Sequence, residues 1–337
     1  MKAVGFKKDG AVAGGGTLVD MDVPEPVAGP RDLIVRIKAV SVNPVDVKAR
    51  VFPSAADAGP KILGFDAAGL VEAVGSEVSL FKVGDEVFYA GDITRPGTNS
   101  ELHAVDERIV GRKPASLDWA EAAAMPLTAI TAWELLFDRL RLPRGGENGG
   151  GSLLIINGAG GVGSILIQMA RRLTGLTVIA TASREETIDW AAKMGAHHVI
   201  DHHKPIDEEL VRIGHPTVDY VAGLSASDRY LPIFPKIVAP QGHVVFIDDP
   251  AQFDIMPLKR KSISVSLEFM FTRPMFRTSD MIAQHDMLEE ISDMLDAGEL
   301  KSTLVQRLSP INAEAIAEAH RVAESGKAIG KTVIEGF

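Results

Sequence analysis

The chain has 337 residues, with 45 acidic and 35 basic side chains, a net charge of −10 and no cysteine. Because this length exceeds what one hydrophobic core usually organises, we expect two domains. The absence of cysteine excludes disulfides, thiolate zinc sites and the usual iron–sulfur clusters. No block of basic residues offsets the acidic balance, so nucleic acid and anionic membrane surfaces are not expected partners.

The start of the chain carries no sign of a targeting segment. Residues 1–8 contain no apolar stretch of the length that a signal peptide needs. No uninterrupted apolar run approaches the roughly 18 residues of a membrane-spanning helix. We therefore expect a soluble protein of the cytoplasm.

The first third of the chain is predicted to be rich in short β-strands. Apolar or alternating segments at residues 32–40, 69–75 and 85–90 are bounded by glycine and turn residues. Glycine and proline interrupt this region often, which is typical of a compact barrel of short strands. The helices predicted next span residues 118–125 and 131–140, with Pro126 between them.

A glycine-rich turn follows the apolar run at residues 153–157. It reads Gly158-Ala159-Gly160-Gly161-Val162-Gly163, and residues 164–170 after it are predicted to form a helix. In such a turn Gly158 permits the sharp bend, Gly160 lets the backbone approach a pyrophosphate, and Gly163 lets the helix pack closely on the strand. The diphosphate would lie on the N–H groups at the start of the helix. The segment predicts a dinucleotide site, and the alternative is a purely structural turn.

Strands and helices alternate after the glycine-rich turn. This alternation predicts a parallel sheet with helices on both faces. The predicted strands span residues 177–182, 198–200, 218–222, 243–247 and 262–269, and the predicted helices span residues 187–194, 279–297 and 313–324.

Several segments, taken in order, carry a resemblance to a known family. They are residues 41–46 (Ser-Val-Asn-Pro-Val-Asp), 64–69 (Gly-Phe-Asp-Ala-Ala-Gly), 83–87, 126–133, the glycine-rich turn and the tail at 324–331. In this order and spacing they resemble the medium-chain dehydrogenase/reductase superfamily over essentially the whole chain. More narrowly, they resemble its quinone oxidoreductase-like branch, often called zinc-type alcohol dehydrogenase-like proteins.

The resemblance implies an α/β protein with a defined domain order. Residues 1–127 would form a GroES-like β-barrel catalytic domain, and residues 128–269 a Rossmann coenzyme domain with a doubly wound parallel sheet. Residues 270–337 would return to the catalytic domain. The segment 262–269 resembles the edge strand that related dimers pair across a two-fold axis, so a homodimer is a further hypothesis.

The resemblance also bears on metal binding. In zinc-dependent members the catalytic metal is held by a cysteine, by the histidine of a Gly-His-Glu segment and by a later cysteine. The corresponding positions here are Asn43, Phe65 and Leu127. Phenylalanine and leucine have no donor atoms and an amide is a poor zinc ligand, so we expect no zinc. The four-cysteine lobe that binds a structural zinc in such relatives is missing as well.

Ser183 and Arg184 indicate which dinucleotide is bound. An acidic residue about 20 positions after the glycines is typical of NAD sites, because it binds the ribose hydroxyls. At that spacing this chain has Ser183 followed by Arg184. A hydroxyl and a guanidinium suit a 2′-phosphate, which favours NADPH. Glu185 and Glu186 keep NADH possible, and the alternative for Arg184 is a solvated loop residue.

Two further cofactor contacts are expected, at His202 and Phe246. In the family the turn after residues 198–201 lies near the adenine end of the cofactor, so His202 is a hypothetical adenine or ribose contact. Phe246, in the strand at 243–247, is the second expected cofactor contact. The histidine pairs 197–198 and 202–203 do not predict a metal site, because adjacent side chains of a strand point to opposite sides.

Asn43, Thr128 and Tyr89 are the expected catalytic residues. In the family the segments of Asn43 and Thr128 flank the nicotinamide and the substrate. Asn43 would bind the substrate carbonyl or the nicotinamide ribose, and Thr128 would contact the nicotinamide side. Tyr89 would donate to a carbonyl oxygen, although a tyrosine in a strand is more often a core or rim aromatic.

These expectations lead to one leading hypothesis for function. The chain would be a zinc-independent, NADPH-dependent oxidoreductase that reduces quinones or other α,β-unsaturated carbonyls by hydride transfer. An alcohol or aldehyde oxidoreductase is the first alternative. An NADPH-binding sensor or structural protein without turnover is an alternative of another class.

Overall fold

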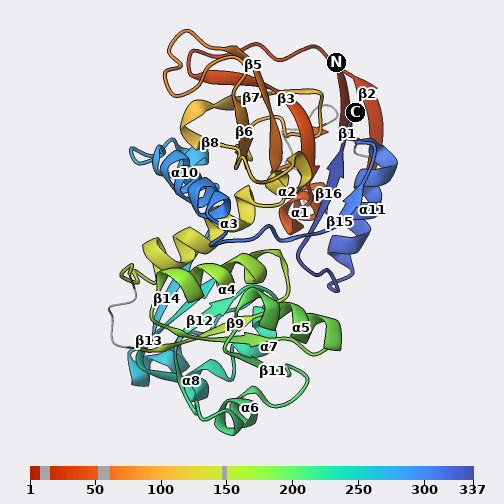
Figure 1. Cartoon of the computed structure of the whole chain (residues 1–337). Helices are drawn as coiled ribbons and strands as arrows, with labels where there is room; N and C mark the ends of the chain where they lie inside the picture. The colour runs from red at the N-terminus through yellow and green to blue at the C-terminus, as the bar shows by residue number, and fades with distance from the viewer. Residues whose placement is uncertain (8–15, 52–60, 146–149) are drawn as a thin grey trace. The chain divides into compact units, whose positions relative to one another are not determined.

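The computed structural model describes residues 1–7, 16–51, 61–145 and 150–337. The chain divides into two compact units, one made of residues 1–130 with 271–337 and the other of residues 131–270. The first unit therefore contains both ends of the chain, coloured red to yellow and blue in Figure 1. The second unit contains the continuous middle of the chain.

A largely antiparallel sheet forms the centre of the first unit. Its order is β15-β16-β3-β5-β6-β8, and β7 also pairs with β3. In β16 the residue Val333 lies opposite Ser41 of β3, and the N–H of Val42 donates to the carbonyl of Thr332. The last strand of the chain therefore begins beside residues 42 and 43. The strands are β3 (Asp32–Ser41), β5 (Ala67–Val74), β6 (Glu86–Tyr89), β7 (Leu102–Asp106), β8 (Val110–Arg112), β15 (Leu304–Leu308) and β16 (Lys331–Glu335).

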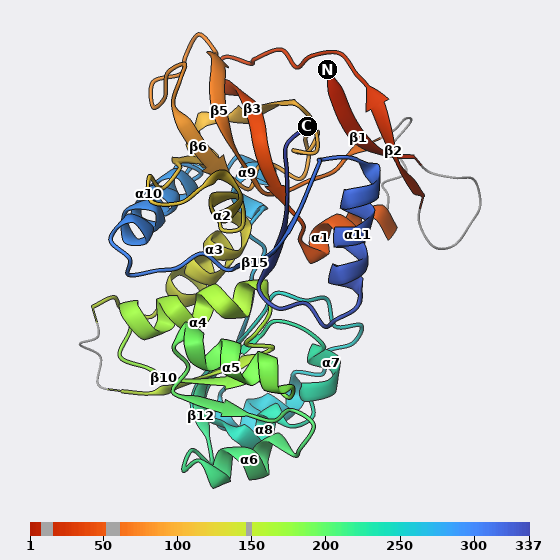
Figure 2. The ribbon, with the colours of Figure 1, turned by 45° about the vertical axis from the view of Figure 1, so that its right-hand side comes forward.

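A small sheet of order β2-β1-β4 and several helices complete this unit. Helix α11 packs against α1, as Figures 1 and 2 both show. It begins where the Asn312 side chain accepts the N–H of Ala315, and its buried face includes His320. The elements are β1 (Lys2–Lys7), β2 (Thr17–Asp22), α1 (Pro44–Val51), β4 (Lys61–Ile62), η1 (Glu107–Ile109), α2 (Trp119–Ala123), α3 (Pro126–Trp133), α9 (Thr272–Phe276), α10 (Ala283–Asp296) and α11 (Ala313–Glu324).

The second unit is built on a parallel sheet of six strands in the order β11-β10-β9-β12-β13-β14. Counted from β9, this order is 3-2-1-4-5-6, the arrangement of dinucleotide-binding folds. It confirms the predicted α/β class and Rossmann sheet. The elements are η2 (Glu134–Arg139), β9 (Ser152–Ile156), α4 (Gly161–Leu173), β10 (Thr177–Thr181), α5 (Glu185–Met194), β11 (His198–Ile200), α6 (Ile206–Arg212), β12 (Val218–Gly223), α7 (Ser227–Tyr230), α8 (Phe234–Ile237), β13 (Val238–Phe246), η3 (Met256–Lys261) and β14 (Ser264–Leu267).

Pro126 lies at a different place in the helices than expected. Rather than standing between two helices, Pro126 is the first residue of α3, and α3 is followed directly by the π-helix η2. Proline is tolerated there because the first N–H groups of a helix have no acceptor inside it, and its fixed φ already suits the helix. The prediction of a separate helix beginning at residue 131 was wrong.

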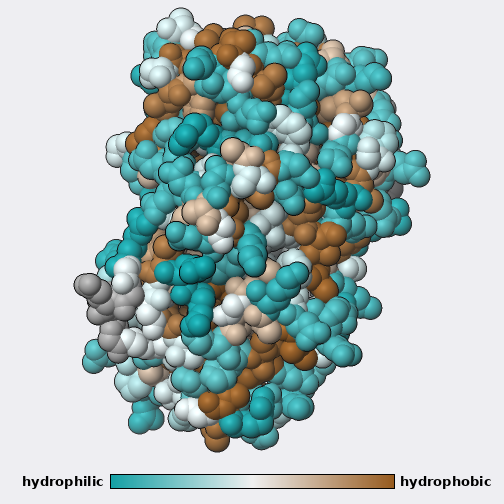
Figure 3. All heavy atoms as spheres, in the orientation of Figure 1, coloured by the Kyte–Doolittle hydropathy of each residue, from teal (hydrophilic) through white to brown (hydrophobic). Residues whose placement is uncertain are grey.

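Among the residues that the structure describes, no helix is long and apolar enough to span a membrane. Hydrophilic residues cover most of the face drawn in Figure 3, with apolar residues in small groups. Such scattered apolar groups are ordinary on a folded protein and need no special explanation.

Candidate functional site

The glycine-rich turn has the close packing that its sequence predicts. Strand β9 is fully buried and runs into the turn. A Cβ atom added to Gly163 would lie 2.4 Å from the carbonyl oxygen of Asn157, and one added to Gly158 would lie 2.6 Å from Cβ of Ala180. Both distances are far below van der Waals contact. Glycine is therefore required at these two positions for the helix and strand to approach.

Gly160 has a different part in the turn. It is the N-cap of α4, in an extended conformation, and no side chain caps the helix there. An added Cβ would meet only the movable side-chain amide of Asn157, at 2.9 Å. The N–H groups of the first helical turn have no acceptor within the helix, so they form a ready anion site. The turn therefore fits the diphosphate of a dinucleotide.

Arg184 is the N-cap of α5, three residues after Thr181 at the end of β10. The turn is tied to the end of β10 because Gly158 donates to the carbonyl of Thr181 and Asn157 donates to its hydroxyl. Nη1 of Arg184 lies 3.1 Å from Oε1 of Glu186, with side chains 38% and 57% exposed. Such an exposed ion pair stabilises the protein little.

Phe246 and His202 are placed differently from one another. Phe246 is only 1% exposed and its ring contacts Phe253, with centroids 5.3 Å apart. Its side chain therefore belongs to the sheet core, and only its backbone at the end of β13 remains for a cofactor contact. His202 lies in a turn, where its carbonyl accepts from Arg229. Burial, together with His203 and Arg229, lowers the pKa of the His202 imidazole. Both cofactor contacts stay predictions.

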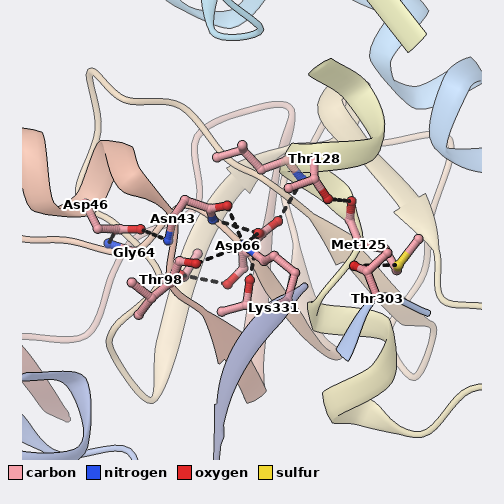
Figure 4. A network of polar contacts seen from close by, with 12 residues as sticks. Asn43, Asp46, Gly64, Asp66, Thr98, Met125, Thr128, Thr303 and Lys331 are labelled. Atoms are coloured by element: carbon pink, nitrogen blue, oxygen red, sulfur yellow. Dashed lines mark hydrogen bonds and ion pairs between the residues drawn. The ribbon is translucent and has the colours of Figure 1, made fainter. Parts of the chain in front are cut away.

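In the first unit Asp66 is the centre of a buried polar network, drawn in Figure 4. Its Oδ2 accepts from the hydroxyl of Ser41 at 2.8 Å and from Nδ2 of Asn43 at 2.7 Å. Its Oδ1 accepts from the backbone N–H of Leu127 at 2.7 Å. Leu127 is the second residue of α3, so the carboxylate accepts an N–H of the first helical turn. Its negative charge also interacts favourably with the positive end of the helix dipole.

Lys331, the first residue of β16, is the cation of this network. Its ammonium donates to the carbonyl of Val42 at 2.9 Å, to Oδ1 of Asn43 and to Oδ2 of Asp66 at 3.2 Å. Burial lowers the pKa of Lys331 and raises the pKa of Asp66, while their mutual attraction opposes both shifts. Because three acceptors surround the three N–H donors, we treat the two groups as an ion pair.

Asp46 supports the same region from the first turn of α1. Its carboxylate accepts the backbone N–H of Asn43 at 2.8 Å and that of Gly64 at 3.0 Å. Complete burial raises the pKa of Asp46 to about 7. These contacts hold the segment of Asn43 against the segment of Asp66.

Tyr89 and Thr128 are both buried and both hydrogen-bonded within the protein. The hydroxyl of Thr128 donates to the carbonyl of Met125 at 3.2 Å. Nε2 of His103 lies 2.9 Å from the carbonyl of Pro96, which only accepts, so Nε2 carries the proton. Nδ1 therefore accepts from the Tyr89 hydroxyl, 3.0 Å away. These contacts favour the alternative of a core aromatic for Tyr89, whose catalytic role stays a prediction like those of Asn43 and Thr128.

The importance of Asp66 and Lys331 was missed from the sequence. Both residues lie in segments that carried the family resemblance, but neither was singled out. A usable signal was present, because Lys331 opens a strand whose other residues are mostly buried. A lysine at a buried position needs a carboxylate or several carbonyl acceptors nearby.

The three positions that correspond to zinc ligands do not fit a metal. The Asn43 amide binds Asp66 and Lys331, and the Phe65 ring packs edge-on against Phe271, with centroids 5.3 Å apart. Neither Phe65 nor Leu127 has a donor atom in its side chain. Among the residues that the structure describes, no group of three or more His, Cys, Asp or Glu side chains is arranged to hold a metal ion.

Comparison with known proteins assigns the chain to the class of protein that the folds of its two units indicate. Residues 29–124 match the family described as "Alcohol dehydrogenase GroES-like domain", and residues 161–286 match "Zinc-binding dehydrogenase". The chain belongs to the medium-chain dehydrogenase/reductase superfamily of oxidoreductases. Within this superfamily it is 39% identical over 336 residues to the zinc-type alcohol dehydrogenase-like protein of Staphylococcus epidermidis, and the match covers 99% of each chain.

Solved structures and a plant enzyme extend the comparison. A structure from Rhizobium etli CFN 42, provisionally assigned as a zinc-dependent alcohol dehydrogenase, has 53% identity and a TM-score of 0.94, covering 100% of this chain and 98% of that one. The quinone oxidoreductase of Pseudomonas syringae has 27% identity and a TM-score of 0.82, with 99% of each chain covered. The NADPH-dependent alkenal/one oxidoreductase of Arabidopsis thaliana is 30% identical over 311 residues, which are 90% of this chain and 71% of that protein.

Proposed function

We propose that this protein is a zinc-independent, NADPH-dependent oxidoreductase that reduces quinones or other α,β-unsaturated carbonyls by hydride transfer. The observation that carries the proposal is a glycine-rich turn at the start of α4, in a chain whose positions corresponding to zinc ligands are Asn43, Phe65 and Leu127. The similarity to a quinone oxidoreductase and to an NADPH-dependent alkenal/one oxidoreductase supports the proposed substrate class.

The second unit would hold the cofactor. The backbone of residues 158–163 would bind the diphosphate at the start of α4, and Ser183 with Arg184 would bind the 2′-phosphate. His202 and the backbone of Phe246 are proposed as further contacts. Bound NADPH supplies the hydride. The protein's contribution is to hold the cofactor in one orientation and to exclude water from the reacting atoms.

Asn43 is proposed to stabilise the charge that develops on the substrate oxygen. When a hydride reaches a conjugated acceptor, negative charge moves onto the carbonyl oxygen, where one well-placed N–H lowers the barrier. Oxidation of a simple alcohol needs more catalytic assistance, because the alcohol oxygen must first lose a proton. A Lewis-acidic metal assists this step in metalloenzymes. Thr128, two residues into α3 from Pro126, is proposed to contact the nicotinamide side.

A substrate panel tests this proposal directly. NADPH oxidation should be much faster with quinones or enones than with simple aldehydes, and much faster than the reduction of NADP⁺ by simple alcohols. Robust alcohol oxidation by protein free of zinc, with no reduction of any activated double bond or quinone, would reject the proposal in favour of an alcohol oxidoreductase. NADPH binding without turnover on any acceptor would instead support a sensor or structural protein.

We also propose that the protein is a cytoplasmic homodimer that associates through β14. Among the described strands β14 pairs only with β13, so its other edge can pair with a second chain. Leu267 at the end of this strand is 70% exposed and would be covered in such a dimer. A monomeric mass by light scattering at micromolar concentration would reject the dimer, and cell fractionation tests the location.

A further inference from the structure

The orientation of the Asn43 amide is determined by its two partners. Lys331 has only donors, so the atom of Asn43 that faces it is the carbonyl oxygen Oδ1. Asp66 is an acceptor when ionised, so the atom that faces it is Nδ2. Rotating the amide by half a turn would place like groups together on both sides. One N–H and one oxygen lone pair of Asn43 remain beyond these two contacts.

The same ion pair also ties together three distant segments. Asp66 binds the Asn43 side chain through Oδ2, binds the start of α3 through Oδ1, and directly follows Phe65 in the chain. These are the three segments in which zinc-dependent members of the superfamily carry their metal ligands. Here a buried carboxylate and ammonium, 0% and 3% exposed, hold the three segments together (Figure 4).

We propose that Asp66 and Lys331 are positioning residues that orient Asn43 for the reduction, an inference that rests on the proposed function. Stability by itself does not call for this pair. Two buried charges lose their hydration, and replacing such a pair with neutral groups of similar size is often neutral or even stabilising. The pair is therefore explained better by the orientation that it imposes on Asn43 and α3 than by the energy of the fold.

The test is the paired variant Asp66→Asn/Lys331→Met, which removes both charges and keeps similar volumes. Its control is Asp32→Asn/Arg95→Met, which removes a less buried ion pair, 12% and 30% exposed, with an N–O distance of 2.8 Å elsewhere in the same unit. We expect both to fold, as judged by circular dichroism and thermal unfolding. Only the first should lower kcat, by about tenfold to hundredfold, with the KM for NADPH unchanged.

The Asn43→Ala background shows whether the pair acts through Asn43. In that background the paired change should cause little further loss of kcat, because Asn43 has already been removed. A paired variant with the kcat of the unmodified protein overturns the proposal, and so does an equal further loss in the Asn43→Ala background. If the paired variant does not fold, Asp66→Asn/Lys331→Gln replaces it, with the same expected loss of kcat and the same outcome against the proposal.

Failure of the proposed function is recognised separately. If the unmodified protein turns over no acceptor, the positioning role is tested by the side-chain amide signals of Asn43 in ¹H–¹⁵N spectra. The proton donated to Asp66 should exchange slowly in the unmodified protein and rapidly in the paired variant. Unchanged exchange of that proton in the folded paired variant overturns the proposal even without activity.

Discussion

The ammonium of Lys331 lies 3.2 Å from the carboxylate of Asp66, although the two residues are 265 positions apart in the sequence. The pairing of β16 with β3 brings them together, because it places the start of the last strand beside Val42 and Asn43. The C-terminal segment is therefore part of the candidate site as well as of the fold.

Cofactor choice is tested with Arg184→Ala. If Arg184 binds the 2′-phosphate, NADPH should bind more tightly than NADH, and the variant should lose about 1.5–3 kcal/mol of NADPH binding, the usual contribution of a charged hydrogen bond. Fluorescence titration of both cofactors measures the effect. Arg172→Ala is the control, since Arg172 is exposed in the last turn of α4, far along the helix from the glycine turn. Equal dissociation constants for NADPH and NADH in the unmodified protein would contradict the assignment.

Two glycine variants separate packing from cofactor binding. Gly163→Ala should destabilise the second unit by about 1–3 kcal/mol, because its Cβ would overlap a backbone carbonyl that cannot move freely. Gly160→Ala should change stability little, since its Cβ would meet only a movable side chain, but it should weaken NADPH binding at the crowded diphosphate. Denaturant unfolding and cofactor titration measure the two effects. Equal losses of stability in the two variants would show that Gly160 also has a packing role.

The zinc content of the purified protein tests whether Asn43, Phe65 and Leu127 can bind a metal. Purified protein should contain much less than one zinc per chain, because two of these three side chains have no donor atom. Chelators should leave activity unchanged. Elemental analysis before and after dialysis against a chelator checks this. One tightly held zinc per chain, lost together with activity, would contradict the prediction.

The role of Asn43 in the reaction is tested with Asn43→Ala. Loss of a donor to the developing oxyanion should lower kcat for an enone by about a hundredfold, the lower end for such donors. The dissociation constant for NADPH should stay nearly the same, since the proposed contact is to the substrate. Steady-state kinetics with one enone and one quinone measures the first quantity, and titration the second. An unchanged kcat would remove Asn43 from the proposed mechanism.

The stability of the protein should fall in acid because of His320. This imidazole is 0% exposed, and neither of its nitrogens has a hydrogen-bond partner among the described residues. Burial lowers the pKa of His320 to about 4, with the Arg50 charge adding to the shift. The unfolded chain takes up a proton below its pKa of about 6.5 and the folded chain does not. The contribution of neutral His320 to the free energy of unfolding is therefore fully present above pH 6.5. About 3 kcal/mol of it is lost as the pH falls towards 4.

The variant His320→Leu isolates this contribution from other groups that titrate in the same range, such as His103. Its free energy of unfolding should depend less steeply on pH between 6.5 and 4 than that of the unmodified protein. Urea unfolding at several pH values measures both slopes. Parallel slopes in the two proteins would show that His320 is already charged or already solvated in the folded state.

Local patterns were sufficient to predict the strand, the tight glycine-rich turn and the helix that the structure has at β9 and α4. The apolar strand, the spacing of Gly158, Gly160 and Gly163, and the helix after them all lie within about 20 consecutive residues, and each acts on its own neighbours. The mismatch to zinc was also visible in the sequence. It depends on the chemical type of the side chains at Asn43, Phe65 and Leu127, which no packing can change.

The tertiary structure alone decided which buried groups meet. The binding of Asn43 to Asp66 and Lys331 depends on strand pairing between the two ends of the chain, and a shift of one residue in that register would turn Lys331 to the other face of the sheet. The same is true of Tyr89, whose hydroxyl is bound by His103 from another strand. The residue types of Asn43 and Tyr89 predict catalytic roles for them. Their partners follow from long-range contacts, which no local pattern encodes.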